Sequence, residues 1–303
     1  MEEKDILIEK IMSLKKKKNA VILAHTYQRS EIYTVADFIG DSYGLSKKAT
    51  KTNADIIVFC GVDFMAESAY ILNPEKIVLI PTQLANCPMA AMVDVVGLRK
   101  LKVDHPKAAV VSYVNTTAAV KAESDICCTS ANAVKVVNSL EEDEVIFVPD
   151  SNLANYVMRH TDKKIISWNG WCYVHKKFSP EGLIQAKAIH LDAKVLVHPE
   201  CIPEVVDLAD EVFSTTGMIN FVKQSPDKKF IIATEVGVVE RLRFEFPNKI
   251  FFQAPPGGTC LQMKKTTLPI VLDALMMEQF KVTVPEDIQI RAKKALDRML
   301  NVA

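Results

Sequence analysis

Short runs of Val, Ile and Leu recur along the chain, and each run ends in polar residues. Three of them are VILAHTY, AVVSYVN and KVLVHPE, at positions 21–27, 109–115 and 194–200. Continuous apolar runs of this length are typical of strands that are buried on both faces of a parallel sheet. The runs begin 88 and then 85 residues apart, which indicates a threefold repeat.

Three further strands follow each of these runs at matching distances. The second strands fall at 37–42, 125–130 and 210–215, the third at 54–63, 143–150 and 228–235, and the fourth at 76–81, 163–168 and 248–253. Helical segments separate the strands, so each copy reads strand–helix–strand–helix–strand–helix–strand. We therefore predict an α/β fold of three homologous parallel-sheet units, related by pseudo-threefold symmetry, with the active site at their junction.

The boundaries between units are predicted where a helix leads into the next first strand. The first repeat covers residues 1–104 with an N-terminal helix, the second covers 105–190, and the third covers 191–303 with C-terminal helices. The C-terminal helices are expected because apolar residues recur there at helical spacing.

Polar residues occupy matched positions where the predicted strands end. The first strands end at His25, Tyr113 and His198, followed two residues later by Tyr27, Asn115 and Glu200, and the second strands end at Ser42, Ser130 and Thr215. Parallel strands place their carboxyl ends at one edge of an α/β sheet, where ligands bind, so these side chains should gather at the junction. The third strands end at Asp63, Asp150 and Glu235. The first two are interpreted as helix caps, a role that fits Glu235 less well.

Three of the seven cysteines follow the same register. Cys87, Cys172 and Cys260 lie 62, 59 and 62 residues after the matched end of the first strand in their own repeats. Three sheet edges that face a pseudo-threefold axis would bring these thiols together. The cysteines without counterparts in the other repeats are expected to be buried small apolar residues: Cys60, Cys127 and Cys201.

Charge and composition narrow the possible functions. The chain carries 37 Lys and Arg residues and 37 Asp and Glu residues, a balance that gives no general field for attracting nucleic acid or an anionic membrane. The N-terminus has no signal-peptide pattern and no apolar stretch reaches the roughly 18 residues of a membrane span, so we expect a cytoplasmic protein with reduced thiols. The patterns CxxC, HExxH, GxGxxG and Walker A are absent. Any metal bound by these cysteines must therefore be held by residues far apart in the sequence.

Three thiolates without a fourth protein ligand suit an open metal site. A [4Fe–4S] cluster on Cys87, Cys172 and Cys260 would keep one iron free to act as a Lewis acid. A structural zinc ion normally has four ligands, and His175, three residues after Cys172, could complete such a site. A non-catalytic structural zinc protein and an iron–sulfur sensor are therefore alternatives to an enzyme. The polar residues at all three strand edges favour the enzyme, because a structural site does not need them.

Several stretches of the chain resemble the quinolinate synthase family from end to end. They include ILAHTYQ, GVDFMAES, YVNTTA, NGWCYVH, VHPEC and CLQMKKTTL. The resemblance implies three α/β domains around one [4Fe–4S] cluster per chain, bound by the three matched cysteines with one open iron. It also implies that iminoaspartate condenses with dihydroxyacetone phosphate to form quinolinate, with loss of phosphate and water, in NAD biosynthesis. These two small molecules are the expected partners, with an aspartate-oxidising enzyme as a source of iminoaspartate, and no nucleic acid or membrane partner is expected.

Condensing a ketose phosphate with an enamine requires proton transfers, which suit a phenol and a carboxylate. We assign Tyr27 and Glu200 as the acid–base pair and His25 as a further catalytic residue. The expected substrate-binding residues donate to substrate oxygens or orient them: His25, Ser42, Tyr113, Asn115, Ser130, His175, His198, Glu200 and Thr215.

The three hydroxyl residues at the ends of the second strands precede predicted helices. Ser42, Ser130 and Thr215 are expected to cap these helices and to bind anions together with the free N–H groups of the first turns. His175 is expected either to bind phosphate or to support the loop that carries Cys172.

Overall fold

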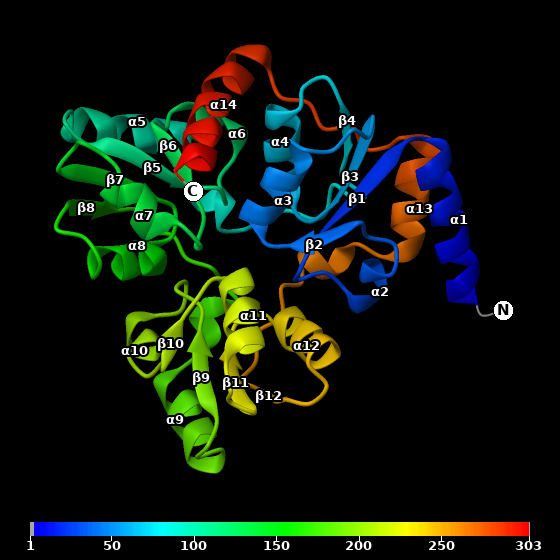
Figure 1. The fold of residues 1–303 in the computed structure, drawn as a ribbon. Coiled ribbons are helices and arrows are strands. Elements are labelled where there is room, and N and C mark those ends of the chain that lie inside the picture. The colour runs from blue at the N-terminus through cyan, green and yellow to red at the C-terminus, as the bar shows by residue number, and fades with distance from the viewer. Residues whose placement is uncertain (1–2, 303) are drawn as a thin grey trace.

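The computed structural model describes residues 3–302, which form three four-stranded sheets whose neighbouring strands run parallel (Figure 1). The first sheet has the order β2-β1-β3-β4. Its strands are β1 (Ala20–His25), β2 (Phe38–Gly40), β3 (Ile56–Cys60) and β4 (Ile77–Leu79), connected by α2 (Ser30–Tyr33), α3 (Ser42–Ala49) and α4 (Asp63–Leu72). The N-terminal helix α1 (Glu3–Lys17) precedes them.

The second and third sheets repeat this topology, with the orders β6-β5-β7-β8 and β10-β9-β11-β12. The second contains β5 (Ala109–Tyr113), β6 (Ile126–Cys128), β7 (Glu144–Val148), β8 (Lys164–Ser167), α6 (Ala118–Ala122), α7 (Ala133–Asn138) and α8 (Ser151–Met158). The third contains β9 (Lys194–Val197), β10 (Glu211–Val212), β11 (Lys229–Ala233), β12 (Ile250–Gln253), α10 (Pro203–Val206), α11 (Thr215–Gln224) and α12 (Val236–Glu245). The predicted α/β fold of three homologous parallel-sheet units is therefore confirmed.

The repeat is visible in individual hydrogen bonds as well as in topology. An acidic residue just before each second strand accepts a hydrogen bond from a backbone N–H of the first strand. The pairs are Asp37 with Ile22 at 2.8 Å, Asp125 with Val110 at 2.7 Å, and Asp210 with Val195 at 2.7 Å. Because the first strands are almost completely buried, these carboxylates fix the second strands against them in the same way in all three units.

The helix that follows each cysteine loop packs on the sheet of the next unit. Leu98 of α5 (Val95–Asp104) shares a core with Val110 of the second sheet, and Leu183 of α9 (Pro180–Ile189) shares one with Val195 of the third. Leu275 of α13 (Leu268–Met277) lies in the core of the first sheet, next to α1 (Figure 1). The three units therefore form a closed ring.

The C-terminal helices were expected to belong with the third repeat, but they pack on the first and second units. Helix α13 covers the first sheet, and α14 (Glu286–Asn301) packs against α6, β6 and α4 of the second and first units. The reason is that α13 is the third copy of a helix whose partner is always the following sheet. The boundaries near 104 and 190 stay predictions. Among residues 3–302, no helix combines the length and the apolar composition that crossing a bilayer requires.

Candidate active site

A cavity lies where the three units meet. Its walls come from the carboxyl ends of the first strands and from the loops that carry the matched cysteines, as parallel-sheet topology predicts. The residues predicted to form the site all line it: His25, Tyr27, Ser42, Cys87, Tyr113, Asn115, Ser130, Cys172, His175, His198, Glu200, Thr215 and Cys260. The structure therefore brings these residues together, while the role of each stays a prediction.

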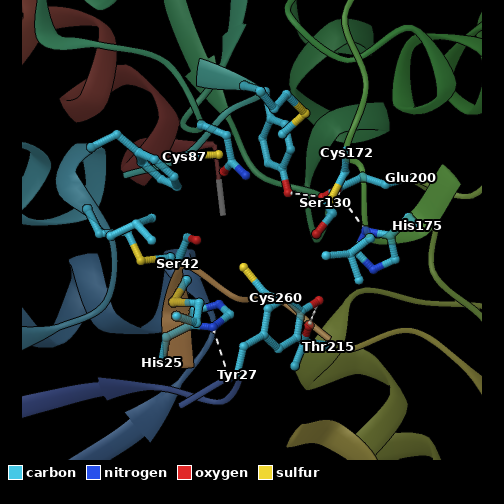
Figure 2. Close-up of a pocket in the computed structure, with 18 of the residues that line it drawn as sticks. His25, Tyr27, Ser42, Cys87, Ser130, Cys172, His175, Glu200, Thr215 and Cys260 are labelled. Carbon is cyan, nitrogen blue, oxygen red and sulfur yellow. Dashed lines mark hydrogen bonds and ion pairs between the residues drawn. The ribbon is translucent and has the colours of Figure 1, made fainter. Parts of the chain in front are cut away.

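The three cavity cysteines come from three separate loops (Figure 2). Each is partly buried and leads into a short 3-10 turn: η1 (Ala90–Met92), η2 (His175–Lys177) and η3 (Met263–Lys265). The backbone N–H of the first residue in each turn bonds to the sulfur three residues earlier. Bonds of this kind stabilise metal-bound thiolates, so the donor atoms and the loops both suit a metal centre held by cysteines.

Burial raises the pKa of the cavity thiols. The pKa of Cys87 rises to about 12 through burial, and the neighbouring Cys260 adds to this effect. For Cys172, the charge of Glu200 adds to burial and raises the pKa further. The protein alone therefore favours neutral thiols, and metal cations would supply the positive charge that makes them thiolates.

The other cysteines lie outside the cavity wall. Cys60, Cys127, Cys128 and Cys201 are fully buried among apolar side chains. The predicted burial of Cys60, Cys127 and Cys201 as small apolar residues is confirmed.

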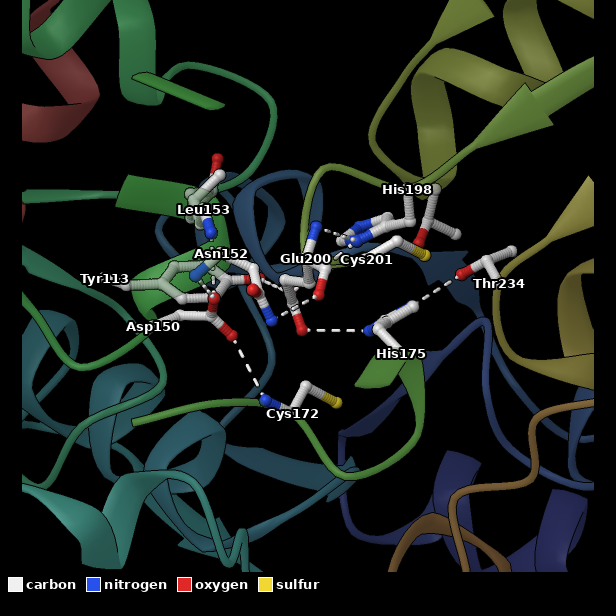
Figure 3. Close-up of polar contacts among 12 residues, drawn as sticks. Tyr113, Asp150, Asn152, Leu153, Cys172, His175, His198, Glu200, Cys201 and Thr234 are labelled. Atoms are coloured by element: carbon white, nitrogen blue, oxygen red, sulfur yellow. Dashed lines mark hydrogen bonds and ion pairs between the residues drawn. The ribbon is translucent and has the colours of Figure 1, made fainter. Parts of the chain in front are cut away.

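Glu200 is the buried charge at the centre of the site (Figure 3). Its Oε1 accepts a hydrogen bond from the Tyr113 hydroxyl, and its Oε2 lies 3.0 Å from Nδ1 of His175. Burial alone would raise the pKa of Glu200, but the neighbouring His175 and the hydrogen bonds from His175 and Tyr113 outweigh it and lower the pKa to about 2. Glu200 is therefore an ionised carboxylate held in a closed pocket.

A chain of hydrogen bonds leads from Glu200 to Tyr27. Nε2 of His175 lies 2.9 Å from Oγ1 of Thr234, which lies 3.2 Å from the Tyr27 hydroxyl. A second hydroxyl, from Thr215, lies 3.1 Å from the same phenol. Burial, with the nearby Glu200 charge, raises the pKa of Tyr27 well above its usual value, so Tyr27 is a neutral phenol that can donate a proton.

His25 and His198 have the same tautomer for the same reason. Nδ1 of His25 accepts the backbone N–H of Tyr27 at 3.1 Å, and Nδ1 of His198 accepts that of Glu200 at 3.3 Å. Burial, with nearby positive groups, lowers the pKa of both rings to about 3, so both are neutral. The proton of each ring is therefore on Nε2, from which it can be donated to a bound oxygen.

The expectation that the cavity hydroxyls cap helices is wrong. Asp41 caps α3 by accepting the N–H of Gly44, and Ser214 caps α11 by accepting the N–H of Gly217. Ser42 and Thr215 are therefore the first residues inside these helices. Ser130 lies two residues before Asn132, which holds the cap position of α7. Because the preceding residues do the capping at α3 and α11, the hydroxyls of Ser42 and Thr215 are left to face the cavity.

One group of three side chains in the cavity could hold a metal ion by itself. The sulfur of Cys172, a ring nitrogen of His175 and a carboxylate oxygen of Glu200 all lie within 4.8 Å of one another. Both ring nitrogens of His175 already have protein partners, however, so binding metal there would break the bond to Glu200 or to Thr234. The three cysteines need no such rearrangement of hydrogen bonds.

Sequence reasoning missed Thr234, which joins His175 to Tyr27. Its position directly before Glu235 matches Val62 and Pro149 in the other two repeats. Thr234 is the only one of the three with a hydroxyl. This difference at a matched position could have indicated a functional residue.

Comparison with known proteins decides the family. The family described as "Quinolinate synthetase A protein" matches residues 9–301. The quinolinate synthase of Methanoregula boonei is 55% identical over 300 residues, which cover 99% of both chains. That of Geobacter metallireducens is 53% identical over 298 residues, which cover 98% of both chains. The chain belongs to the quinolinate synthetase A family.

The family match includes every residue of the cavity wall named above and the whole of α14. The "Quinolinate synthase 1" of Methanosarcina acetivorans is also 55% identical, over 98% of this chain and 97% of its own length. The ring of three units is therefore contained in the part of the chain that the quinolinate synthetase A family shares.

Proposed function

We propose that this protein is a quinolinate synthase, which condenses iminoaspartate with dihydroxyacetone phosphate to quinolinate, with loss of phosphate and water, in NAD biosynthesis. Relatives that carry this name and are at least 53% identical over almost the whole chain support the activity. The structural observation that carries the proposal is the position of Cys87, Cys172 and Cys260 around one polar cavity. Three cysteines converge there from three units, together with acid–base groups that a structural metal site does not require.

The proposed cofactor is one [4Fe–4S] cluster per chain, bound by these three cysteines. Such a cluster keeps one iron without a protein ligand, and this iron can act as a Lewis acid toward a substrate oxygen. Thiolate ligands require reducing conditions, so a cytoplasmic location is also part of the proposal.

The acid–base work is assigned to Glu200 and Tyr27. Glu200 is ionised and can take a proton from a carbon next to a carbonyl, whereas Tyr27 is neutral and can give a proton to a departing hydroxyl. His175 and Thr234 join the two groups by bonds of 3.0, 2.9 and 3.2 Å. A proton gained at Glu200 can therefore return to Tyr27 between steps without passing through solvent.

Neutral donors and one free acceptor are assigned to substrate binding. The Nε2–H groups of His25 and His198 can donate to carboxylate or phosphate oxygens, as can the hydroxyls of Ser42 and Thr215 beside the free N–H groups of α3 and α11. Within residues 3–302, Oδ1 of Asn115 is buried in the cavity wall without a hydrogen-bond partner. It can accept the N–H of an imine or enamine. Iminoaspartate is the two-electron oxidation product of aspartate, so an aspartate-oxidising enzyme would supply it.

Purification without oxygen tests this proposal. We expect a brown protein with about four irons and four sulfides per chain, which forms quinolinate from dihydroxyacetone phosphate and freshly generated iminoaspartate. Cys87→Ser, Cys172→Ser and Cys260→Ser should each lose both the iron and the activity. A colourless protein with one zinc and no synthase activity would support the structural zinc alternative instead.

A further inference from the structure

Each cavity cysteine has its backbone held by a carboxylate from its own unit. The acidic residue at the end of the third strand accepts a hydrogen bond from the N–H of the cysteine some 20 residues later, as Figure 3 shows for Asp150 and Cys172. The pairs are Asp63 with Cys87 at 3.2 Å, Asp150 with Cys172 at 3.2 Å, and Glu235 with Cys260 at 3.1 Å. The same contact therefore occurs three times around the cavity.

The same carboxylates also bind the first turn of the next helix. Asp150 accepts the N–H groups of Asn152 and Leu153 at 2.8 Å, and Glu235 accepts that of Gly237 at 2.7 Å. Glu235, which fitted a capping role less well from its sequence, is thus a cap. The predicted capping role of Asp63 is wrong, because Val62 holds the cap position of α4 and Asp63 is the first residue of the helix. From there Asp63 accepts the N–H of Phe64, in the same first turn, at 2.8 Å.

A second bond fixes each loop just before its cysteine. The carbonyl two residues before the cysteine accepts a backbone N–H from the start of the helix. The pairs are Asp63 N–H with Ala85, Ser151 N–H with Gly170, and Val236 N–H with Gly258, at 2.9, 2.8 and 2.7 Å. Each loop is therefore held at two points, the N–H of the cysteine and the carbonyl two residues before it. Both bonds come from the start of the helix, which the carboxylate also binds.

We propose that Asp63, Asp150 and Glu235 are positioning residues that hold the three cysteine loops in the geometry needed to bind the metal cluster. Asp150 and Glu235 are fully buried, and their oxygens serve the helix and the cysteine at once. Shifting one of these carboxylates would move a cysteine relative to the other two. This inference rests on the proposed cluster.

The three sites differ in a way that gives distinct expectations for amide variants. Asp150 binds the helix through Oδ1 and Cys172 through Oδ2, so Asp150→Asn turns an N–H₂ group toward one of these donors. Glu235 likewise uses Oε2 for the helix and Oε1 for its cysteine, and Oε1 also lies 3.2 Å from the Lys264 ammonium. Asp63 uses the single oxygen Oδ1 for both bonds, and Asparagine there keeps that acceptor.

The test is the rate at which anaerobically purified holoenzyme loses iron to a ferrous chelator. Asp150→Asn and Glu235→Gln should lose iron about tenfold faster than wild type or more, the usual effect of removing a group that orients a metal ligand. Asp63→Asn should stay within about twofold of wild type, whereas Asp63→Ala should match the fast variants. Amide hydrogen exchange at Cys172 and its neighbours should accelerate in Asp150→Asn.

Asp94→Ala is the matched control for loss of a helix cap. Asp94 caps α5 by accepting the N–H of Gly97 at 2.8 Å and has no bond to a cysteine. This variant should release iron at the wild-type rate. If Asp150→Asn and Glu235→Gln lost iron at the wild-type rate, the inference would be overturned. If Asp150→Asn does not fold, the rate of iron loss from Glu235→Gln alone tests the inference. A wild-type protein purified without iron and sulfide would refute the proposed cluster instead. Amide hydrogen exchange at Cys172 would still test the positioning role in that case, and exchange in Asp150→Asn as slow as in wild type would contradict it.

Discussion

The sharpest prediction concerns Thr234, whose hydroxyl is the link between His175 and Tyr27. Thr234→Val removes this hydroxyl and keeps the shape of the side chain. The change deletes the bonds of 2.9 Å to His175 and 3.2 Å to Tyr27, and leaves Nε2 of His175 without a partner in a side chain that is 1% exposed. Tyr27 keeps its bond to Thr215 at 3.1 Å, so the phenol should stay in place.

Two magnitudes follow from this geometry. A buried ring nitrogen left without a partner should lower the free energy of unfolding by about 1–3 kcal/mol. Loss of the path for the proton should lower kcat about 100-fold, which corresponds to about 2.7 kcal/mol in the activation free energy. Neither bond touches a cysteine, so iron and sulfide content should equal that of wild type.

The assay is quinolinate formation at saturating substrates, with iron content and urea unfolding measured on the same preparation. Thr266→Val is the matched control, because Thr266 is also fully buried and its Oγ1 has no partner among residues 3–302. That variant should keep both kcat and stability. If Thr234→Val kept kcat within about threefold of wild type with normal iron content, proton transfer between Glu200 and Tyr27 would have to follow another route.

The remaining predictions test the assigned roles and the packing of the ring. Tyr27→Phe should lower kcat about 100-fold with the cluster intact, and an unchanged rate would reduce Tyr27 to a binding group. Cys172→Ser should remove iron and sulfide while Cys201→Ser keeps them, as chemical analysis will show, and iron retained in the first variant would contradict the ligand assignment. Leu296→Ala, at a fully buried position of α14, should lower the free energy of unfolding by about 2–5 kcal/mol in urea, unless the helix docks only weakly.

The sequence was sufficient to predict the fold and the residues around the cavity, because both depend on period and register. A run such as AVVSY can be buried on both faces only in a covered sheet, and its copies in the other repeats end at the same edge. The matched positions of His25, Tyr113 and His198 therefore implied a shared location before any side chain was placed. Three copies made this argument stronger than one motif could.

Details that depend on single residues were harder to predict. Ser42 and Thr215 were expected to be caps, yet the residue before each one does the capping. Asp, Ser and Thr are all favourable at the cap position, so a DS or ST pair leaves the choice open until the backbone is known. The binding role predicted for these hydroxyls does not depend on capping, and both side chains line the cavity.

The place of α13 could not be read from its own sequence, because an apolar helix face does not identify the sheet that it covers. Thr234 was missed for a related reason, since its partners His175 and Tyr27 come from other units. Contacts between units leave no periodic signal in either segment.

The closed ring has a consequence for how the proposed metal site forms. Each cysteine loop begins at a bond to a carboxylate of its own unit and ends in a helix that packs on the next sheet. The three loops can therefore take their final positions only when all three units have docked. Since a bound cluster stabilises only that docked state, metal binding and assembly of the ring must favour each other. If the proposed cluster is bound, removing its iron should then lower the stability of the whole ring and not only that of the loops, because no unit holds more than one of the three proposed ligands.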